Sequence, residues 1–320
     1  MPSPRISVVT PTYLRPQEAV GLLENLSRQA VLPYELVMVD GAPSDERATE
    51  EAVKPRIPAL PFRVNYIRHA GGTAIQRNVG IEAAQGDFIA FIDDDIRLEP
   101  GFFEAILHAF SPDREHHVGG IVGYRTSDHF DGNTQTRWRW YRRLGLLTTF
   151  EPGRYDFAVG YPINANMQPP FTGVREVDFM TTACAMWRRE LFDEGLRFDL
   201  FFRGYGVLED AHFSLRARRK WTLLQCGDAH CQHLSSPHGR TNREKIGYMC
   251  VVNYYYVFRE IAGPLTLKQN FRFWRYQAFE FLRMLMFGLR RWRADDWAEL
   301  LGRLRGLFAV LSGTAWRRSS

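Results

Sequence analysis

Three adjacent carboxylates are the residues in this sequence whose chemistry is easiest to recognise. Asp93, Asp94 and Asp95 directly follow the apolar run 88–92. Three neighbouring acids repel one another unless a cation lies among them. Carboxylate oxygens, together with substrate phosphates, are the usual ligands of Mg²⁺, and Mn²⁺ accepts similar ligands. The cluster predicts either a divalent cation site or a solvated acidic turn, and taken alone it supports both equally.

A second acidic pair, Glu209 and Asp210, stands where a helix is expected to begin. A carboxylate in that position could accept a proton from a substrate hydroxyl as a general base. Acidic residues are also common in the first turn of a helix, because they interact favourably with the helix dipole. Taken alone, the pair favours this second, structural interpretation.

Histidines and cysteines gather at 226–233, as Cys226, His230, Cys231 and His233. Their spacing fits no familiar zinc pattern, although zinc is an alternative. One histidine that completes a site made of carboxylates and a diphosphate is the favoured interpretation. His238 is a weaker candidate for the same role.

Arg77 follows a glycine pair, Gly71 and Gly72, at the start of an expected helix. An arginine there could reach a diphosphate with its forked guanidinium group. The alternative is an ordinary surface arginine, because the chain has 41 basic residues.

The elements that must position these groups alternate between strands and helices. Helical spacing of apolar residues and short apolar runs predict strands at 6–10, 35–39, 64–67 and 87–92, with helices at 17–29, 74–84 and 102–110. This alternation predicts βαβ units and a mainly parallel sheet, with ligands beyond the carboxyl ends of the strands. Tyr13, Asp40 and the acids 93–95 all follow strand ends, so we expect them at one rim.

The second half of the chain is less regular. We expect loops over 151–173, a buried strand or a strand–helix junction over 177–187, and a helix that opens at 208–210. A short strand at 223–224 should precede His230, and long helices should follow residue 237.

Composition restricts the class of protein. The chain has 320 residues, of which 45% are hydrophobic and 14% aromatic, so it can build a large core and is not mainly disordered. Four cysteines without a CxxC pair favour a reducing cytoplasm over a disulfide scaffold. The sequence indicates no signal peptide and no apolar stretch long enough to span a membrane.

Positive charge is concentrated at the C-terminus. Of the 41 basic and 36 acidic residues, eleven basic and four acidic ones follow residue 263. Apolar residues recur at helical spacing over 274–289, flanked by arginines, which is typical of helices at a membrane interface. The alternatives are a solvated helical face, or a helical hairpin packed on the rest of the chain or in a dimer.

Five motifs, taken together, resemble family 2 glycosyltransferases in their order and spacing. They are Pro11-Thr12-Tyr13 with Arg15, Val39-Asp40-Gly41, Gln76 to Gly80, Gly86 to Asp95, and Leu208-Glu209-Asp210. The resemblance covers residues 6–233. It implies the GT-A fold: an α/β, Rossmann-like, mainly parallel sheet flanked by helices, here with a C-terminal helical extension.

The resemblance also implies roles for individual residues. Asp210 would be the catalytic base, with Glu209 beside it. Asp95 would be the main ligand of Mn²⁺ or Mg²⁺, together with Asp93 and His233. The nucleotide-sugar would be bound by Pro11, Tyr13, Arg15, Asp40, Arg77, Asp93 and Asp94.

The expected activity is inverting transfer of a hexosyl or deoxyhexosyl group from a nucleotide diphosphate sugar, with UDP or dTDP favoured. The acceptor would be a hydroxyl of a glycan or lipid-linked molecule in cell-envelope or exopolysaccharide biosynthesis. We expect a catalytic domain at 1–237 and a membrane-associating region at 238–320, in a cytoplasmic protein bound to the inner face of the cell membrane and able to form a homo-oligomer.

Two other functions remain as alternatives. A sugar-phosphate nucleotidyltransferase would need a glycine-rich phosphate loop near the N-terminus, which residues 8–13 do not provide. A non-catalytic protein that binds a membrane or nucleic acid would use the basic tail, but its scattered arginines match no recognised nucleic-acid reader, so we expect no nucleic-acid partner.

Overall fold

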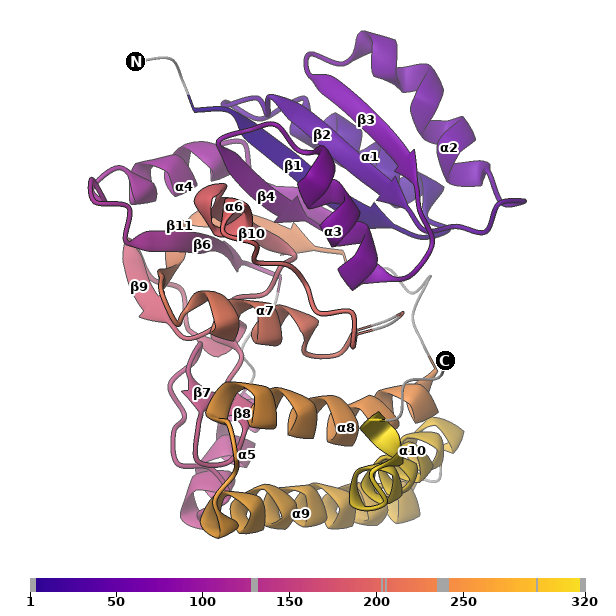
Figure 1. The fold of residues 1–320 in the computed structure, drawn as a ribbon, viewed down its shortest axis with the longest axis vertical. Helices are drawn as coiled ribbons and strands as arrows, with labels where there is room; N and C mark the ends of the chain where they lie inside the picture. Colours follow the sequence, from indigo (N-terminus) through magenta and orange to yellow (C-terminus); the bar gives the residue numbers. More distant parts are fainter. Residues whose placement is uncertain are drawn as a thin grey trace. The chain divides into compact units, whose positions relative to one another are not determined.

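A computed structural model describes residues 4–127, 132–202, 204, 206–234, 242–291 and 293–316. The chain divides into two compact units (Figure 1). Unit 1 takes Met1–Phe130, Asn164–Gly204 and Glu209–Gly239, and unit 2 takes Asp131–Ile163, Tyr205–Leu208 and Arg240–Ser320. The second unit therefore includes a middle segment of the chain as well as the C-terminal helices.

The first half of the unit 1 sheet is entirely parallel. Its strands run in the order β3-β2-β1-β4, with bounds β1 Ile6–Thr12, β2 Glu35–Asp40, β3 Arg63–Arg68 and β4 Phe88–Ile92. Every residue of β1, β2 and β4 is buried, as expected for parallel strands with both faces covered. Helices α1 (Pro16–Leu26), α2 (Ala48–Val53) and α3 (Thr73–Ala83) connect these strands.

The second half of the sheet is mixed. β10 (Cys184–Arg188) runs antiparallel between β4 and β6 (Val118–Arg125). β11 (Thr222–His233) is parallel to β6 and antiparallel to both β5 (Ile96–Leu98) and β9 (Val174–Val177). Within the described residues this completes a nine-stranded sheet. Because β10 and β11 run antiparallel to β4 and β5, the start of β10 lies beside Ile92 and the end of β11 lies beside Ile96, close to the acids 93–95.

Aromatic packing holds the helix that carries the second acidic pair. α7 spans Glu209–Ala217, and its Phe213 stacks on Phe198 with ring centroids 4.2 Å apart. The Trp187 ring meets Phe213 edge-on at 4.9 Å. Such pairs add to the free energy of burial, so the start of α7 is anchored against the sheet.

Most predicted elements of unit 1 are confirmed to within a few residues. α4 spans Phe102–Phe110, as predicted, and the loop prediction over 151–173 holds apart from the short pieces β7 (Tyr155–Asp156), β8 (Tyr161–Pro162) and a 3-10 turn at Ala165–Met167. The segment 177–187 is not one strand, because β9 ends at Val177 and β10 begins at Cys184. Two further short helices are a 3-10 helix at Lys54–Ala59 and α6 at Glu190–Asp193.

Two predicted strand ends are wrong. β1 continues through Pro11 to Thr12, pairing with Val39 and Asp40 of β2. β11 continues far beyond residue 224, and its register shifts between Gln225 and His230. The irregular stretch around Gly227 breaks the apolar alternation, which is why the sequence predicts only a short strand there.

Unit 2 is built mainly of helices. They are α5 (Gly132–Arg143), α8 (Arg243–Ala262), α9 (Leu267–Arg291) and α10 (Ala294–Leu311), followed by a 3-10 turn at Thr314–Trp316. α8 and α10 pack so closely that a methyl group added at Gly247 or Gly302 would overlap the backbone of the other helix. The long helices expected after residue 237 are therefore present.

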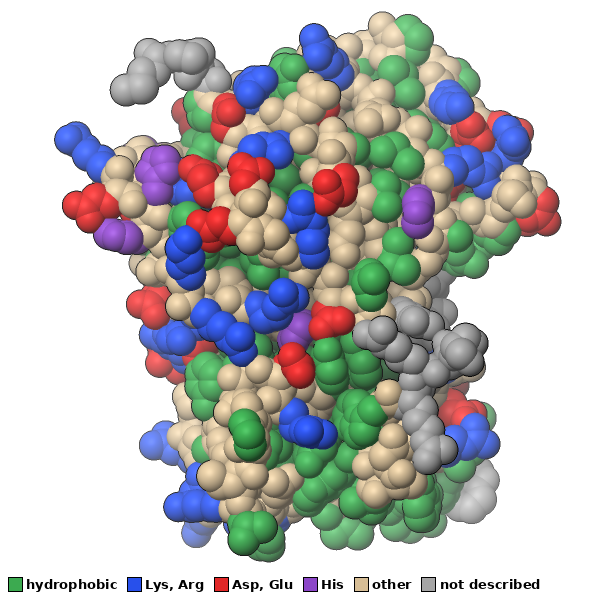
Figure 2. Space-filling view, in the orientation of Figure 1, with side chains coloured by type: hydrophobic (Ala, Val, Ile, Leu, Met, Phe, Trp, Pro, Cys, Tyr) green, Lys and Arg blue, Asp and Glu red, His purple; other side chains and the backbone are tan. Residues whose placement is uncertain are grey.

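The surface of α9 and α10 is rich in exposed apolar side chains (Figure 2). The large ones are Leu267, Phe271, Leu282, Met286, Phe287, Leu289, Leu301, Phe308 and Leu311. In the described part of the chain, no helix combines the length and the apolar character needed to cross a bilayer.

Candidate active site

The central acid of the cluster is bound from two sides. Thr12 donates a hydrogen bond to Asp94 Oδ2 at 2.8 Å, and Arg15 Nη1 donates to Asp94 Oδ1 at 2.8 Å. The same Arg15 nitrogen lies 3.4 Å from Asp95 Oδ2. Leu14, which lies between Thr12 and Arg15 on the chain, has a φ of 54°, a left-handed conformation that turns the backbone sharply at this point. Burial raises the pKa of Asp94 to about 6, although the Arg15 charge opposes the shift.

Arg77 is buried and lies between the two acidic motifs. Its Nη2 donates to Asp93 Oδ1 at 2.9 Å, and its Nη1 forms an ion pair with Glu209 Oε1. Only 3% of the residue is exposed, which excludes the alternative of an ordinary surface arginine. The guanidinium group also lies over the Phe198 ring at 5.6 Å from its centroid. The Arg77 guanidinium group thus connects the end of β4 to the start of α7.

A close approach of two glycines brings α3 to the second acidic motif. Gly72 has a φ of 89° and forms an isolated parallel bridge with Gly204. A Cβ atom added to Gly72 would lie only 2.5 Å from the backbone of Gly204. Thr73 follows, and its hydroxyl donates to Glu209 Oε2 at 2.8 Å. Glycine is required here because the backbones touch and φ is positive. The flexible glycine pair seen in the sequence therefore serves to place Thr73 and Arg77 next to Glu209.

The two acids of the second motif have different surroundings. Both carboxylate oxygens of Glu209 are engaged, by Arg77 and Thr73, whereas Asp210 receives one hydrogen bond from the described residues, from the Ala211 amide at 2.7 Å. Burial raises the pKa of Glu209 to about 7 despite the opposing charge of Arg77. Burial also raises the pKa of Asp210, opposed by the Ala211 amide and by the charges of Arg77 and Arg125. Asp210 is therefore the member of the pair with an oxygen left to accept a proton.

Strand pairing places His233 beside the acid cluster. β5 begins directly after Asp95 and pairs with β11, so that Ile96 lies opposite His233. The Leu234 amide donates to the Asp95 carbonyl at 2.9 Å, and His233 Nε2 lies 3.4 Å from Asp95 Oδ1. Two residues that are far apart in the sequence thus contact each other because two antiparallel strands are in this register.

The donors at this position suit a divalent cation. A separation of 3.4 Å between Asp95 Oδ1 and His233 Nε2 allows both to bond one ion at the usual distances of about 2.0–2.2 Å. Within the described residues, no group of three or more His, Cys, Asp or Glu side chains is arranged to hold a metal. The protein donors fit a metal whose remaining ligands come from the substrate.

The zinc alternative does not fit this geometry. His230 lies 3.4 Å from Glu99 and packs against the Tyr124 ring, while Cys231 is fully buried. Successive side chains of a strand point to opposite faces, so His230 and His233 diverge. His238 lies outside the described residues.

The other predicted binding residues lie at the ends of β1 and β2. Pro11 is buried within β1, and Tyr13 just beyond it is 43% exposed. Asp40 at the end of β2 is fully buried and accepts hydrogen bonds from the Tyr66 hydroxyl at 2.6 Å and the Ala42 amide at 2.9 Å. Tyr13 is therefore accessible, whereas Asp40 is a buried acid that holds the Tyr66 hydroxyl and the Ala42 amide.

Sequence reasoning missed four residues that hold this site together: Thr12, Tyr66, Thr73 and Gln76. Gln76 donates to the carbonyls of Thr12 at 2.8 Å and Val39 at 2.7 Å, which ties α3 to the ends of β1 and β2. Gln76 does directly precede Arg77 in the quoted motif, which is the one signal that could have indicated it. Thr12 likewise lies within the motif Pro11-Thr12-Tyr13, whereas no local pattern marks Tyr66 or Thr73, whose hydroxyls contact charged side chains across the fold.

Comparison with known proteins agrees with the fold. The sequence profile of Glycosyl transferase family 2 matches residues 7–196, more than half of the chain. The uncharacterized glycosyltransferase YwdF of Bacillus subtilis (strain 168) is 28% identical over 220 residues, which are 68% of this chain and 70% of that protein. Two other curated glycosyltransferases match over only 33% and 30% of their own lengths, so the chain spans about a third of each of them.

Solved structures with the same fold include two characterised enzymes. The mannosyltransferase PcManGT from Pyrobaculum calidifontis, in complex with GDP-Man and Mn²⁺, aligns with a TM-score of 0.54 and 17% identity, covering 99% of this chain and 76% of its own. S. aureus TarS 1-349, in complex with UDP-GlcNAc, aligns with a TM-score of 0.50 and 16% identity, covering 97% and 92%. These likenesses identify the fold as GT-A, and the matched profile, together with the acidic motifs at the sheet edge, shows that this chain belongs to glycosyl transferase family 2.

Proposed function

We propose that this glycosyltransferase uses a divalent cation to transfer a sugar, with inversion, from a nucleotide diphosphate donor to an acceptor hydroxyl. The observation that carries the proposal is the pair of acidic motifs joined by Arg77, with His233 beside Asp95 and Asp210 left with an oxygen free of hydrogen bonds from the described residues. In this arrangement Asp95, His233 and Arg77 are suited to binding a diphosphate with its cation, and Asp210 is suited to accepting a proton.

Donor binding uses the rim formed by β1, β2 and β4. Tyr13 stacks on the base, Pro11 and Asp40 form the wall of its pocket, and Asp93 and Asp94 contact the ribose. Arg15 holds the acid cluster in place, and Arg77 faces the diphosphate. A UDP- or dTDP-sugar is the favoured donor, and TarS, which was crystallised with UDP-GlcNAc, has the same fold.

Asp95 and His233 would hold the cation, with Asp93 as a further donor of the acid cluster. A cation held there would supply charge neutralisation for the departing nucleotide diphosphate. A nitrogen donor suits Mn²⁺ better than Mg²⁺, which prefers oxygen ligands. PcManGT was crystallised with Mn²⁺.

Asp210 acts as the general base. It takes the proton of the acceptor hydroxyl while that oxygen attacks the anomeric carbon, and the bond to the diphosphate oxygen breaks on the opposite face. A single displacement of this kind inverts the anomeric centre. Glu209 keeps Arg77 oriented between the two motifs, because both its carboxylate oxygens are engaged.

The acceptor is proposed to be a hydroxyl of a glycan or lipid-linked molecule in cell-envelope or exopolysaccharide synthesis. A named relative supports this, since the poly(ribitol-phosphate) β-N-acetylglucosaminyltransferase TarS of Staphylococcus aureus is 31% identical over 94 residues. We propose that residues 1–237 catalyse the reaction and that 238–320 bind the inner face of the cell membrane, since α9 and α10 expose apolar side chains and the segment after 263 carries an excess of basic residues. The family assignment argues against the nucleotidyltransferase and nucleic-acid alternatives.

Two measurements test the activity. Thermal unfolding with UDP, dTDP and GDP, each with and without Mn²⁺, should show the largest rise in Tm for a pyrimidine nucleotide with metal, because ligand binding stabilises the folded state. NMR of the transfer product should show an inverted anomeric configuration. A retained configuration contradicts the single displacement, and equal Tm shifts with and without metal contradict the cation site.

A further inference from the structure

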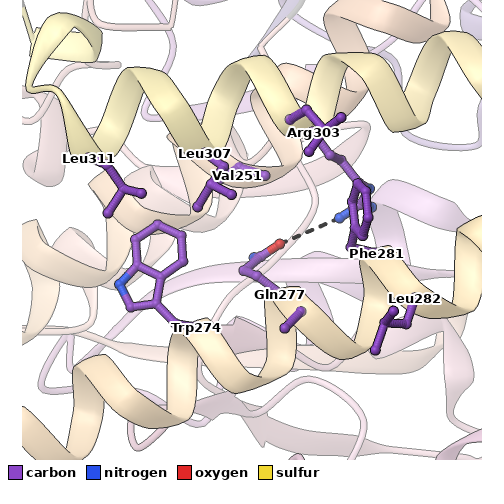
Figure 3. Close-up of a pocket in the computed structure, with 10 residues that line it drawn as sticks. Val251, Trp274, Gln277, Phe281, Leu282, Arg303, Leu307 and Leu311 are labelled. Atoms are coloured by element: carbon purple, nitrogen blue, oxygen red, sulfur yellow. Dashed lines mark hydrogen bonds between the residues drawn. The ribbon is translucent and has the colours of Figure 1, made fainter.

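Unit 2 contains an apolar cavity of about 500 Å³ between α8, α9 and α10 (Figure 3). Trp274 and Phe281 of α9, Leu307 and Leu311 of α10, and Val251 of α8 contribute to its wall. The volume lies within the range of sites that hold small organic ligands, about 300–1,000 Å³. The cavity therefore has room for an apolar ligand, because the described side chains of the bundle do not fill it.

Polar groups occupy one part of the wall. Gln277 rises from α9 toward Arg303 of α10, with its Oε1 3.5 Å from Arg303 Nη1, and Glu299 Oε1 lies 3.5 Å from Arg303 Nη2 (Figure 3). Arg303 Nε is buried and has no hydrogen-bond partner in the described part of the chain. The cavity is thus apolar along most of its length and carries an incompletely satisfied guanidinium group on one side, an arrangement that suits an amphiphile.

The mouth of the cavity continues into exposed apolar surface. Leu282 is 56% exposed and Leu311 is 67% exposed, and both also line the cavity. The segment after residue 263 carries eleven basic and four acidic residues. A molecule with an apolar tail and an anionic head complements an apolar opening in a segment whose net charge is positive.

We infer that this cavity binds one aliphatic chain of an anionic membrane lipid. The inference rests on the proposed membrane association of the C-terminal helices and goes beyond it, because it assigns a site for a single chain. Surface adsorption alone would place apolar side chains at the headgroup level and would not require a cavity between the helices.

A chain-length series tests the site with the full-length protein. Alkyl phosphates of increasing length, kept below their micelle concentrations, should bind about fourfold more tightly for each added methylene until the cavity is full, and then no more tightly. Alkyl maltosides of the same lengths should bind more weakly. An affinity that keeps rising with chain length would indicate adsorption on the surface instead of binding in the cavity. Equal affinity for the maltosides would show that an anionic head is not recognised. Either result overturns the inference.

Matched variants locate the binding. Ala278 lines the cavity and is exposed, so Ala278→Trp fills space without removing a core side chain. Met286 lies on the same helix, is exposed, and does not line the cavity, so Met286→Trp is the control. Ala278→Trp should reduce alkyl phosphate affinity at least tenfold, and Met286→Trp should leave it unchanged, with both variants unfolding at the temperature of the unaltered protein. Equal effects of the two variants contradict the assignment.

Fluorescence supplies a second readout, located at the cavity wall. Brominated alkyl phosphates should quench tryptophan emission, and the quenched component should be absent in Trp274→Phe, since Trp274 lies in the wall. Unchanged quenching in Trp274→Phe would overturn the site. Sedimentation must show that chain binding does not dissociate a dimer, because a second copy of the protein in the cavity would also overturn it.

These assays contain no donor and no acceptor, so they succeed or fail independently of glycosyl transfer. A protein that transfers sugar but does not bind alkyl chains refutes only the cavity assignment. A protein that binds alkyl chains but does not transfer sugar refutes only the proposed function.

Discussion

Arg77 holds Asp93 with one nitrogen of its guanidinium group and Glu209 with the other. These acids come from the end of β4 and the start of α7, two elements that are distant in the sequence. Both contacts require the planar fork of arginine, because an ammonium group is a single point of charge. One side chain therefore bridges the two acidic motifs.

Arg77→Gln should destabilise the fold by about 3–5 kcal/mol, because it leaves buried carboxylates without their counter-charge. Arg77→Lys should cost less but still lower kcat/KM by about 10²-fold, since it keeps the charge and loses the fork. Urea unfolding and transfer kinetics measure the two effects. Arg56→Gln, an exposed arginine on the same unit, is the control, and wild-type kinetics in Arg77→Lys would show that the bridge does not matter for catalysis.

Asp95→Asn should abolish metal-dependent nucleotide binding and leave the fold intact. Asparagine keeps the size of the side chain but removes the charge that attracts the cation. Calorimetric titration of UDP with and without Mn²⁺ measures the change, and Asp193→Asn at an exposed position is the matched control. Unaltered binding in Asp95→Asn would remove this residue from the cation site.

Asp210→Asn should retain donor affinity and lose about 10²–10⁴-fold in transfer rate, because the acceptor hydroxyl then has no positioned base. Glu209→Gln should change donor affinity and rate together, since it releases Arg77. Measured donor Kd and kcat distinguish the two. A near-normal rate in Asp210→Asn would leave that acid with only its interaction with the helix dipole and would direct attention to Glu209.

The pH dependence of catalysis follows from burial of the acids. Because burial raises the pKa of Asp210, kcat/KM should begin to fall at a higher pH than it would with an ordinary carboxylate as the base, and loss of charge from Glu209 should add to the fall near its pKa of about 7. An ordinary carboxylate would lose its charge only at about pH 4. The pH profile should keep its acidic limb in Glu209→Gln if Asp210 is the base. A flat profile down to the ordinary carboxylate range would contradict a buried base.

The same shift acts on stability with the opposite sign. A carboxyl whose pKa is higher in the folded than in the unfolded state binds a proton more readily when folded. For Glu209 the resulting contribution to stability is complete below the unfolded pKa and is lost as the pH rises through about 7. Activity from these acids therefore increases over the pH range in which their contribution to stability decreases.

Membrane association predicts salt-sensitive binding to anionic vesicles. Phe271→Ser and Phe308→Ser remove apolar side chains that are 66% and 67% exposed, so they should weaken vesicle binding without lowering Tm. Removal of the chain after Pro264 should move the protein from the membrane fraction to the soluble one. Flotation with anionic and neutral vesicles measures the binding, and equal flotation of both serine variants and the unaltered protein would favour a packing role for the helices.

Strands β1, β2 and β4 could be predicted from the sequence because they are buried on both faces. Runs such as Ile6–Thr12 and Phe88–Ile92 are continuously apolar or small, and each ends next to a polar residue that marks the sheet edge. β11 was underpredicted because its bulge interrupts the apolar pattern, and partner strands, not its own residues, keep it extended.

The charged members of the site could be proposed from the sequence, but their connections could not. The type of a residue such as Asp93 or Glu209 indicates chemistry, whereas contact with Arg77 depends on a glycine approach that closes only in the folded chain. Thr12 and Tyr66 act through one hydroxyl each, and hydroxyls are too common in sequences to be informative without coordinates.

The antiparallel pairing of β5 with β11 also determines when the proposed cation site can form. Asp95 leaves the ribosome long before His233, and the two meet only when the last strand of the sheet has paired. A nascent chain that ends before β11 has three neighbouring acids without the histidine, so it lacks the complete set of donors. Order of synthesis thus delays assembly of the proposed site until unit 1 is nearly complete, so capture of a metal ion by Asp95 and His233 together would be a late event of folding.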